Sequence, residues 1–213
     1  MKKKVLIVAN LSMHIIKVRK SLILALEIAG YDVEIITARD KYFEILIDEG
    51  YKIHELYALD SQGKSVFEQF KIYFEYKKLY KKINPDFVFH YTIKPNIYGT
   101  LVASSLNIPS VITVNGIGQV YENPLLFKAV SYLYKRACKK AKAVIFQNDD
   151  DRNIFLSRNL VKKEKTFLFC ISWQKNSLVN RHLEVIHPVR ILDRHLDMSL
   201  SDTLSTSAAC QCQ

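Results

Sequence analysis

Residues 86–115, DFVFHYTIKPNIYGTLVASSLNIPSVITVN, decide the fold, because they hold two strand patterns and the helix that joins them. DFVFHY (86–91) and IPSVITVN (108–115) are short apolar runs rich in β-branched and aromatic residues, which is typical of strands buried in a sheet. KPNIYGTLVASSLN (94–107) between them predicts a helix. Strands joined in this way pair in parallel through a right-handed crossover.

The same alternation extends in both directions from this unit. Further strands are predicted at KVLIVAN (4–10), YDVEIIT (31–37), YKIHEL (51–56), KAVIFQN (142–148) and KEKTFLF (163–169). Between them, helical patterns cover residues 15–30, 38–50, 61–84, 123–141 and 149–160. We expect Ser12 to cap the first of these helices, Gly30 to end it, and an aspartate to cap the last.

Alternating strands and helices predict an α/β fold over residues 1–169, a single Rossmann-like, doubly wound parallel sheet. Ligands of such sheets bind beyond the carboxyl ends of the strands. Polar residues and glycines follow three of the predicted strands, and together they predict a ligand crevice at one edge of the sheet: Asn10, Ser12 and His14; His90 and Lys94; Asn115, Gly116 and Gly118.

The 213-residue chain has a net charge of +10, which suits nucleic acid, an anionic membrane or phosphorylated ligands. A nucleic-acid partner is not expected, because helix-turn-helix spacing and ribonucleoprotein aromatic motifs are absent. The four cysteines lack zinc-site spacing, so no metal is expected. The apolar run 5–9 is too short for a secretion signal and no stretch could span a membrane, which predicts a cytoplasmic protein.

The composition changes near residue 170. All 23 Phe and Tyr residues lie at or before Phe169, and Lys outnumbers Arg 22 to 5 up to that point but 1 to 3 beyond it. The last glycine is Gly118. Two interpretations remain open: a natural, poorly ordered C-terminus, or out-of-frame sequence after a truncation, which the joint changes favour. We therefore expect residues 170–213 to be an irregular tail without function.

Two segments of the chain resemble one enzyme family. Residues 90–124, HYTIKPNIYGTLVASSLNIPSVITVNGIGQVYENP, are similar to two consecutive motifs of bacterial family 4 glycosyltransferases. The first motif is the H-x-x-x-K-x-N-x-x-G segment, and the second is the proline, strand and G-x-G run that follows it. AKAVIFQNDDDRNIF (141–155) resembles the last strand and helix of their N-terminal domain. The chain thus resembles the N-terminal half of a GT-B enzyme that builds capsule, O-antigen (lipopolysaccharide) or related lipid-linked glycans.

This resemblance implies two Rossmann-like domains, of which the N-terminal one holds the acceptor. It implies retaining transfer from a nucleotide sugar, a UDP-linked N-acetylhexosamine, to a lipid-diphosphate sugar, with no cofactor. The donor elements of the family are a basic pair and a Glu-x7-Glu motif in the second domain. After residue 122 this chain has only Glu164 and Glu184, at a different spacing, so we expect it to be inactive alone.

His90, Lys94, Asn115, Gly116 and Gly118 are the predicted acceptor-binding residues. Lys94 is in the first turn of its helix, where the helix dipole disfavours a cation unless an anion binds nearby. Gly116 and Gly118 permit close approach of a ligand to the backbone. His90 could donate to an acceptor sugar or phosphate, or be satisfied by the backbone. Asn115 could orient a substrate but not act as a base, and no catalytic residue is assigned.

Ser12 and His14 are weaker candidates, because the first loop lacks the paired glycines of many relatives, and both could be structural. Two basic helical segments, VFEQFKIYFEYKKLYKKI (66–83) and LLFKAVSYLYKRACKKAK (125–142), indicate an anionic membrane surface as a partner, unless their apolar faces simply cover the sheet. The expected location is therefore peripheral, on the inner face of the cytoplasmic membrane.

Three other functions remain possible. The chain could be a non-catalytic subunit that recruits the lipid acceptor and pairs with a donor-domain partner chain. A nucleic-acid binder is suggested by the pI of 9.3 alone. A sugar-nucleotide epimerase shares the fold but also needs a second domain.

Overall fold

A computed structural model describes residues 2–59, 66–116 and 124–168 of the chain. Gly118 and residues 170–213 lie outside the described residues, so the predicted domain boundary and the predicted tail stay predictions. At residues 59, 66–68 and 125 only the backbone is described.

All seven predicted strands are present and form one sheet in which every neighbouring pair is parallel. The order across the sheet is β3-β2-β1-β4-β5-β6-β7. The order therefore reverses between β1 and β4, and ligands of such sheets bind at this switch point, beyond the carboxyl ends of these two strands. The bounds are β1 Lys4–Leu11, β2 Asp32–Ala38, β3 Lys52–Glu55, β4 Phe87–Tyr91, β5 Ser110–Val114, β6 Ala143–Phe146 and β7 Thr166–Leu168.

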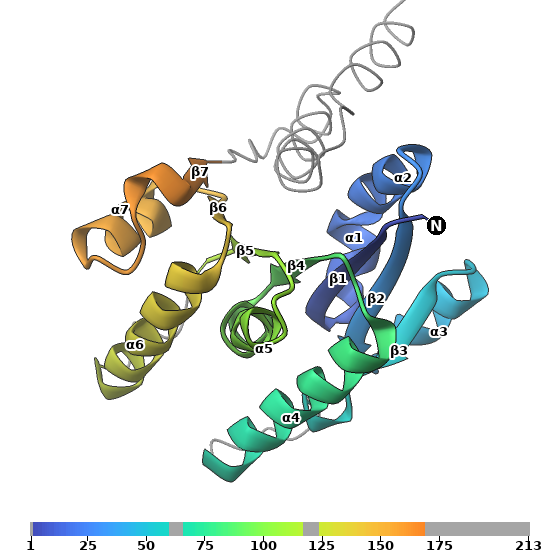
Figure 1. Cartoon of the computed structure of the whole chain (residues 1–213), viewed down its shortest axis with the longest axis horizontal. Helices are drawn as coiled ribbons and strands as arrows, with labels where there is room; N and C mark the ends of the chain where they lie inside the picture. Colours follow the sequence, from blue (N-terminus) through green and yellow to red (C-terminus); the bar gives the residue numbers. More distant parts are fainter. Residues whose placement is uncertain (1, 60–65, 117–123, 169–213) are drawn as a thin grey trace, which may run out of the picture.

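Helices cover both faces of the sheet (Figure 1). The helices α1 and α2 lie on one face, and α4, α5 and α6 lie on the other. The bounds are α1 Ser12–Val18, α2 Lys20–Ile28, α3 Phe43–Asp48, α4 Val66–Ile83, α5 Thr100–Ser105, α6 Pro124–Lys140 and α7 Asp149–Ser157. A π-helical turn, Pro95–Gly99, precedes α5, and short 3-10 turns cover Tyr57–Leu59 and Lys163–Lys165.

The central strands are buried on both faces of the sheet, so successive side chains along each strand enter the core on opposite faces. Ile7 and Phe89 pack with residues of α1 and α2, whereas Leu6 and Val88 pack with residues of α4 and α5. All four side chains are fully buried. A one-residue shift in register would exchange these two sets, so the apolar runs fix the pairing. The predicted doubly wound α/β domain is confirmed.

Three local predictions are wrong. The helix predicted over residues 15–30 is two helices, because Arg19 between them has φ −116° and ψ −4°. Ser12 does not cap α1: Leu11 occupies the N-cap position, and the Ser12 hydroxyl donates to Ala38 O at 3.2 Å. The cap of α7 is Asn148, whose Oδ1 accepts from Asp151 N at 2.7 Å, rather than an aspartate.

Candidate acceptor crevice

The predicted ligand crevice corresponds to the edge of the sheet where β1, β4 and β5 end. In the parallel register Val8 lies opposite His90, and His90 lies opposite Ile112, so the residues that follow these three positions meet at one edge. A hydrogen bond from Asn10 N to Thr92 Oγ1, at 3.3 Å, joins the end of β1 to the end of β4. Residues far apart in sequence are thereby brought together as the sequence predicts.

His90 does not face this crevice, and its predicted placement at the ligand surface is wrong. Its side chain is fully buried, and both ring nitrogens have internal partners. Tyr80 OH lies 2.7 Å from Nε2, and Thr100 Oγ1 lies 3.0 Å from Nδ1. Burial lowers the pKa of His90 from 6.5 to about 3, so the ring is neutral. The imidazole is a core hydrogen-bonding group that ties β4 to α4 and α5.

Gly99 makes this arrangement possible. A Cβ atom at residue 99 would lie 2.6 Å from both Cδ2 and Nε2 of His90, and 2.9 Å from Tyr80 OH. Any larger residue would therefore push the imidazole or the phenol out of place. Glycine is therefore required at this position, where the helix packs closely against His90 and Tyr80.

The junction between β4 and the following helix is conformationally strained. Thr92 has φ +70°, a left-handed conformation that β-branched residues rarely adopt. Its Oγ1 donates to Tyr91 O and accepts from Asn10 N, and its carbonyl accepts from Asn96 N at 3.0 Å. Strained residues of this kind cluster at functional sites, where the surrounding structure holds them in place.

Lys94 lies in the first helical turn after this strained residue, as predicted. It is half-buried, and no carboxylate of the described residues pairs with it. The first turn contains no acidic residue either. A cation at the positive end of a helix, without a described counterion, fits an anionic ligand in the crevice.

Asn96, in the π-helical turn that follows this junction, holds the turn in place through side-chain hydrogen bonds. It is buried, and its Nδ2 donates to Thr113 O at 2.8 Å and to Tyr134 OH at 3.2 Å. These bonds connect the π-helical turn to β5 and α6. The asparagine of the H-x-x-x-K-x-N-x-x-G segment is therefore a structural tie.

Asn115 and Arg19 form a contact that the sequence did not predict. With its amide oriented so that donors and acceptors match, Asn115 Nδ2 donates to Thr113 O at 3.0 Å. Its Oδ1 accepts from Arg19 Nη2 at 2.9 Å and from Gln147 Nε2 at 3.2 Å. The Arg19 guanidinium also stacks on the Tyr91 ring, 4.1 Å from the centroid. Asn115 is exposed, so this cluster reaches the surface at the crevice.

The remaining candidates lie close by. Burial, and then the positive charge of Arg19, lower the pKa of His14 below 6.5, while Asp40 opposes the shift. Half-buried His14 therefore lies in the same electrostatic environment as Arg19. Gly116 is exposed and has φ +110°, which favours glycine. Ser12 is buried in its bond to β2 and is not available to a ligand in this structure.

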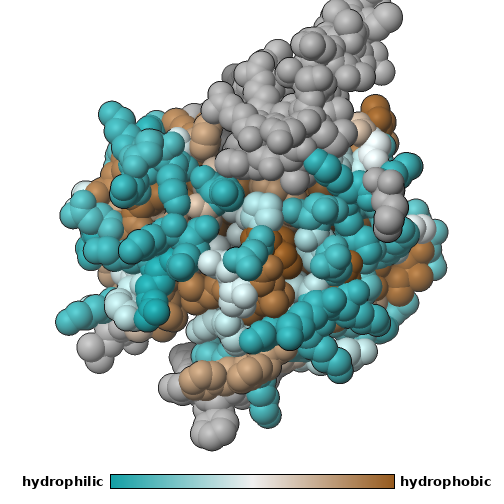
Figure 2. Space-filling model, in the orientation of Figure 1, coloured by the Kyte–Doolittle hydropathy of each residue, from teal (hydrophilic) through white to brown (hydrophobic). Residues whose placement is uncertain are grey.

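Exposed aromatic and basic side chains share one stripe of α4. Phe70 and Phe74 are 58% and 62% exposed. Lys78 and Lys81, which are exposed, and the half-buried Lys77 continue the stripe at helical spacing. Figure 2 shows brown apolar side chains among teal ones in the lower part of the view, where Figure 1 places α4. The Phe67 side chain of the predicted membrane helix lies outside the description.

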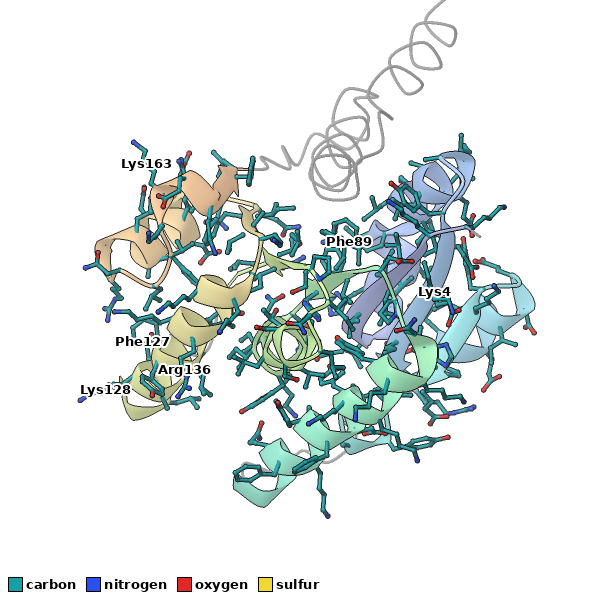
Figure 3. All side chains as sticks on the ribbon, in the orientation of Figure 1. Lys4, Phe89, Phe127, Lys128, Arg136 and Lys163 are labelled. Atoms are coloured by element: carbon teal, nitrogen blue, oxygen red, sulfur yellow. The ribbon has the colours of Figure 1, made fainter. Side chains whose placement is uncertain are left out.

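The second basic helix, α6, presents an exposed polar surface as well. Lys128 and Arg136 lie on its exposed surface (Figure 3), and Tyr132 is exposed between them. Phe127, by contrast, is buried against the sheet side of the helix. Among residues 2–59, 66–116 and 124–168, no helix combines the length and apolar content that a membrane crossing requires.

Arg19 and Thr92 are the site residues that sequence reasoning missed. Arg19 occupies the apolar stripe of its helical pattern, four residues after Ile15 and three before Leu22, and this charged interruption was a usable signal. For Thr92 no signal existed, because a threonine at a strand end does not reveal a left-handed backbone.

Comparison with known proteins identifies the family. The glycosyl transferase 4-like family matches residues 4–148. A Campylobacter jejuni enzyme, N,N'-diacetylbacillosaminyl-diphospho-undecaprenol alpha-1,3-N-acetylgalactosaminyltransferase, is 31% identical over an alignment of 152 residues, and the alignment covers 68% of this chain and 40% of that protein. The chain thus spans about two fifths of the length of this relative.

Solved structures share the fold. A sucrose-phosphate synthase structure from Thermosynechococcus elongatus has a TM-score of 0.63 at 13% identity, over 92% of this chain and 98% of that one. MurG from Acinetobacter baumannii has a TM-score of 0.55 at 15% identity, over 82% of this chain and 47% of that one. These likenesses show the fold, the N-terminal Rossmann-like half of a GT-B structure, and the match over residues 4–148 shows that the chain belongs to the glycosyl transferase 4-like family.

Proposed function

We propose that this chain is the acceptor-binding half of a glycosyltransferase that extends a lipid-diphosphate-linked saccharide. The observation that carries the proposal is the 31% identity to an enzyme whose name specifies a diphospho-undecaprenol acceptor. The family match over residues 4–148 covers six strands of the sheet and includes Arg19, Lys94 and Asn115. In this proposal a second Rossmann-like domain supplies the nucleotide-sugar site, and the sugar transferred is an N-acetylhexosamine from a UDP-linked donor.

The crevice has the chemistry that a diphosphate requires. Lys94 and Arg19 bring two positive charges to the carboxyl ends of β1, β4 and β5, and neither has a carboxylate partner among the described residues. The helix that begins after Thr92 adds its N-terminal dipole. Asn115, which contacts Arg19, and Gly116 next to it are exposed and can contact a sugar.

The exposed aromatic and basic stripe of α4 supports the same proposal, because a lipid-linked acceptor stays in the bilayer. The stripe of α4 combines Phe70 and Phe74, which would enter the headgroup layer, with lysines that attract anionic lipid by about 1 kcal/mol each. We propose that α4 holds the protein peripherally on the inner face of the cytoplasmic membrane.

Flotation with vesicles tests this proposal. Purified protein is mixed with neutral vesicles, vesicles with anionic lipid, and anionic vesicles that also hold undecaprenyl diphosphate-linked N-acetylhexosamine. The proposal predicts binding to anionic vesicles and tighter binding when the lipid-linked sugar is present. Equal binding with and without the lipid-linked sugar would contradict an acceptor site.

A second measurement tests whether this half of the enzyme binds the nucleotide-sugar donor. Isothermal titration with UDP-N-acetylhexosamine should show no binding of comparable strength, because the proposed donor site belongs to a second domain. Tight binding of the nucleotide sugar, together with indifference to the lipid-linked sugar, would reverse the assignment of this half.

A further inference from the structure

Arg19 is a buried cation whose charge no described acidic residue neutralises. The residue is only 7% exposed, and no carboxylate of the described chain lies within 4.0 Å of its guanidinium. The other arginines of the described residues differ: Arg39 and Arg152 form ion pairs, and Arg136 and Arg158 are exposed. Burying an unpaired charge is unfavourable, so the position of Arg19 calls for an anion.

The contacts that Arg19 does make orient its guanidinium without neutralising it. The ring of Tyr91 lies under the guanidinium at 4.1 Å, and Asn115 Oδ1 accepts one hydrogen bond at 2.9 Å. A guanidinium has five N–H donors in a planar fork that matches two oxygens of one phosphate. These neighbours therefore hold the fork in place and leave donors available.

The titratable groups nearest to Arg19 do not supply the missing charge. His14 has a lowered pKa and is neutral at pH 7, because it is partly buried and close to the Arg19 cation. Asp40 is the acid that acts on His14, but its carboxylate accepts from backbone N–H groups. Oδ2 accepts from Met13 N at 3.1 Å, and Oδ1 accepts from Tyr42 N at 2.8 Å.

We propose that Arg19 binds a phosphate group of a diphosphate at the switch point between β1 and β4. Tyr91 ends β4 and Asn115 follows β5, so the guanidinium lies at the edge where the crevice opens. Arginine recognises phosphate with two parallel hydrogen bonds, which a lysine cannot reproduce. The inference rests on the proposed function, in which both substrates carry a diphosphate: the lipid-linked acceptor and the nucleotide sugar.

The test measures binding of three probes by isothermal titration: inorganic pyrophosphate, UDP, and undecaprenyl diphosphate in nanodiscs, with empty nanodiscs as the blank. The full chain is compared with Arg19→Met, which removes the charge and keeps the volume. Arg158→Met is the matched control, because Arg158 also stacks on an aromatic ring, Phe127, at 4.4 Å, but is exposed. Circular dichroism checks that each variant is folded.

We expect Arg19→Met to weaken pyrophosphate binding at least about tenfold, the value of a charged hydrogen bond, and Arg158→Met to leave it unchanged. The larger loss for undecaprenyl diphosphate or for UDP then identifies the source of the diphosphate. Equal binding by all three proteins would mean that pyrophosphate binds the basic surface without specificity, and absence of binding to the unaltered chain would also overturn the inference.

A second variant keeps the inference testable if Arg19→Met does not fold. Asn115→Asp alters an exposed residue and places a carboxylate against the guanidinium, so it supplies an internal counterion. It should weaken pyrophosphate binding as strongly as the loss of Arg19, and unchanged affinity would contradict the site. If pyrophosphate binding depends on Arg19 while vesicles with the lipid-linked sugar are not recognised, the anion site stands and the proposed function fails.

Discussion

Replacement of Gly99 by alanine is the sharpest test of how the crevice is supported. The added Cβ would lie 2.6 Å from two ring atoms of His90 and 2.9 Å from Tyr80 OH, and both of these side chains are fully buried. Contacts below 3.0 Å force a shift, and overpacking a core costs about 1–3 kcal/mol. Displacing the His90–Tyr80 hydrogen bond adds about 1 kcal/mol. Alanine restores only about 0.5–1 kcal/mol through its higher helix propensity.

The net effect is a loss of about 1–3 kcal/mol in the free energy of unfolding, or roughly 3–10 °C in Tm for a domain of this size. Urea unfolding followed by circular dichroism measures it. Ser104→Ala in the same helix is the control and should change stability by less than about 0.5 kcal/mol. If Gly99→Ala were as stable as the unaltered chain, the close packing of residues 80, 90 and 99 would be refuted.

Three further predictions concern the same elements. Tyr80→Phe leaves a buried His90 nitrogen without its partner and should cost about 1–3 kcal/mol of unfolding free energy, measured by urea titration; a neutral change would contradict the hydrogen bond. The pKa of His90 is about 3 in the folded chain and near 6.5 in the unfolded chain. Its contribution to the free energy of unfolding is therefore complete above pH 6.5 and is lost as the pH falls toward 3, by up to about 1.4 kcal/mol per pH unit. Urea midpoints between pH 7 and pH 4 should therefore fall less steeply in His90→Gln, and identical slopes would exclude a neutral buried ring. Phe70→Ser combined with Phe74→Ser should weaken flotation with anionic vesicles roughly thirtyfold, since about 1 kcal/mol of apolar burial is lost per ring and about 2 kcal/mol in total. Leu24→Ser, which removes an exposed apolar residue from α2, should leave flotation unchanged.

The sheet could be predicted because its signal is local. Leu6, Ile7 and Val8 are consecutive apolar residues, and a strand buried on both faces is the structure that uses such a run. The backbone break at Arg19 could not be predicted, because Ile15, Val18 and Leu22 keep helical spacing on both sides of this charged residue. Only the packing of two short helices onto one sheet face determines where the backbone must turn.

The candidate site was predicted less well than the fold. The sequence places His90 at a strand end. How deeply its side chain is buried depends on Tyr80 and Thr100, which come from two different helices. Lys94 was located correctly, because its position in the first helical turn depends on neighbouring residues alone. The contact between Arg19 and Asn115 joins residues 96 positions apart, counted from their numbers, and only the assembled sheet brings them together.

The most direct test of the account is photo-crosslinking with an undecaprenyl diphosphate-linked sugar that carries a diazirine next to the diphosphate. The protein is irradiated in nanodiscs and the labelled peptides are identified by mass spectrometry. The account predicts labels at the carboxyl ends of β1, β4 and β5, at residues 10–14, 92–94 and 115–116. Labels confined to the opposite edge of the sheet, around Asp32 and Lys52, would contradict the claim that the carboxyl ends of these strands form an acceptor crevice.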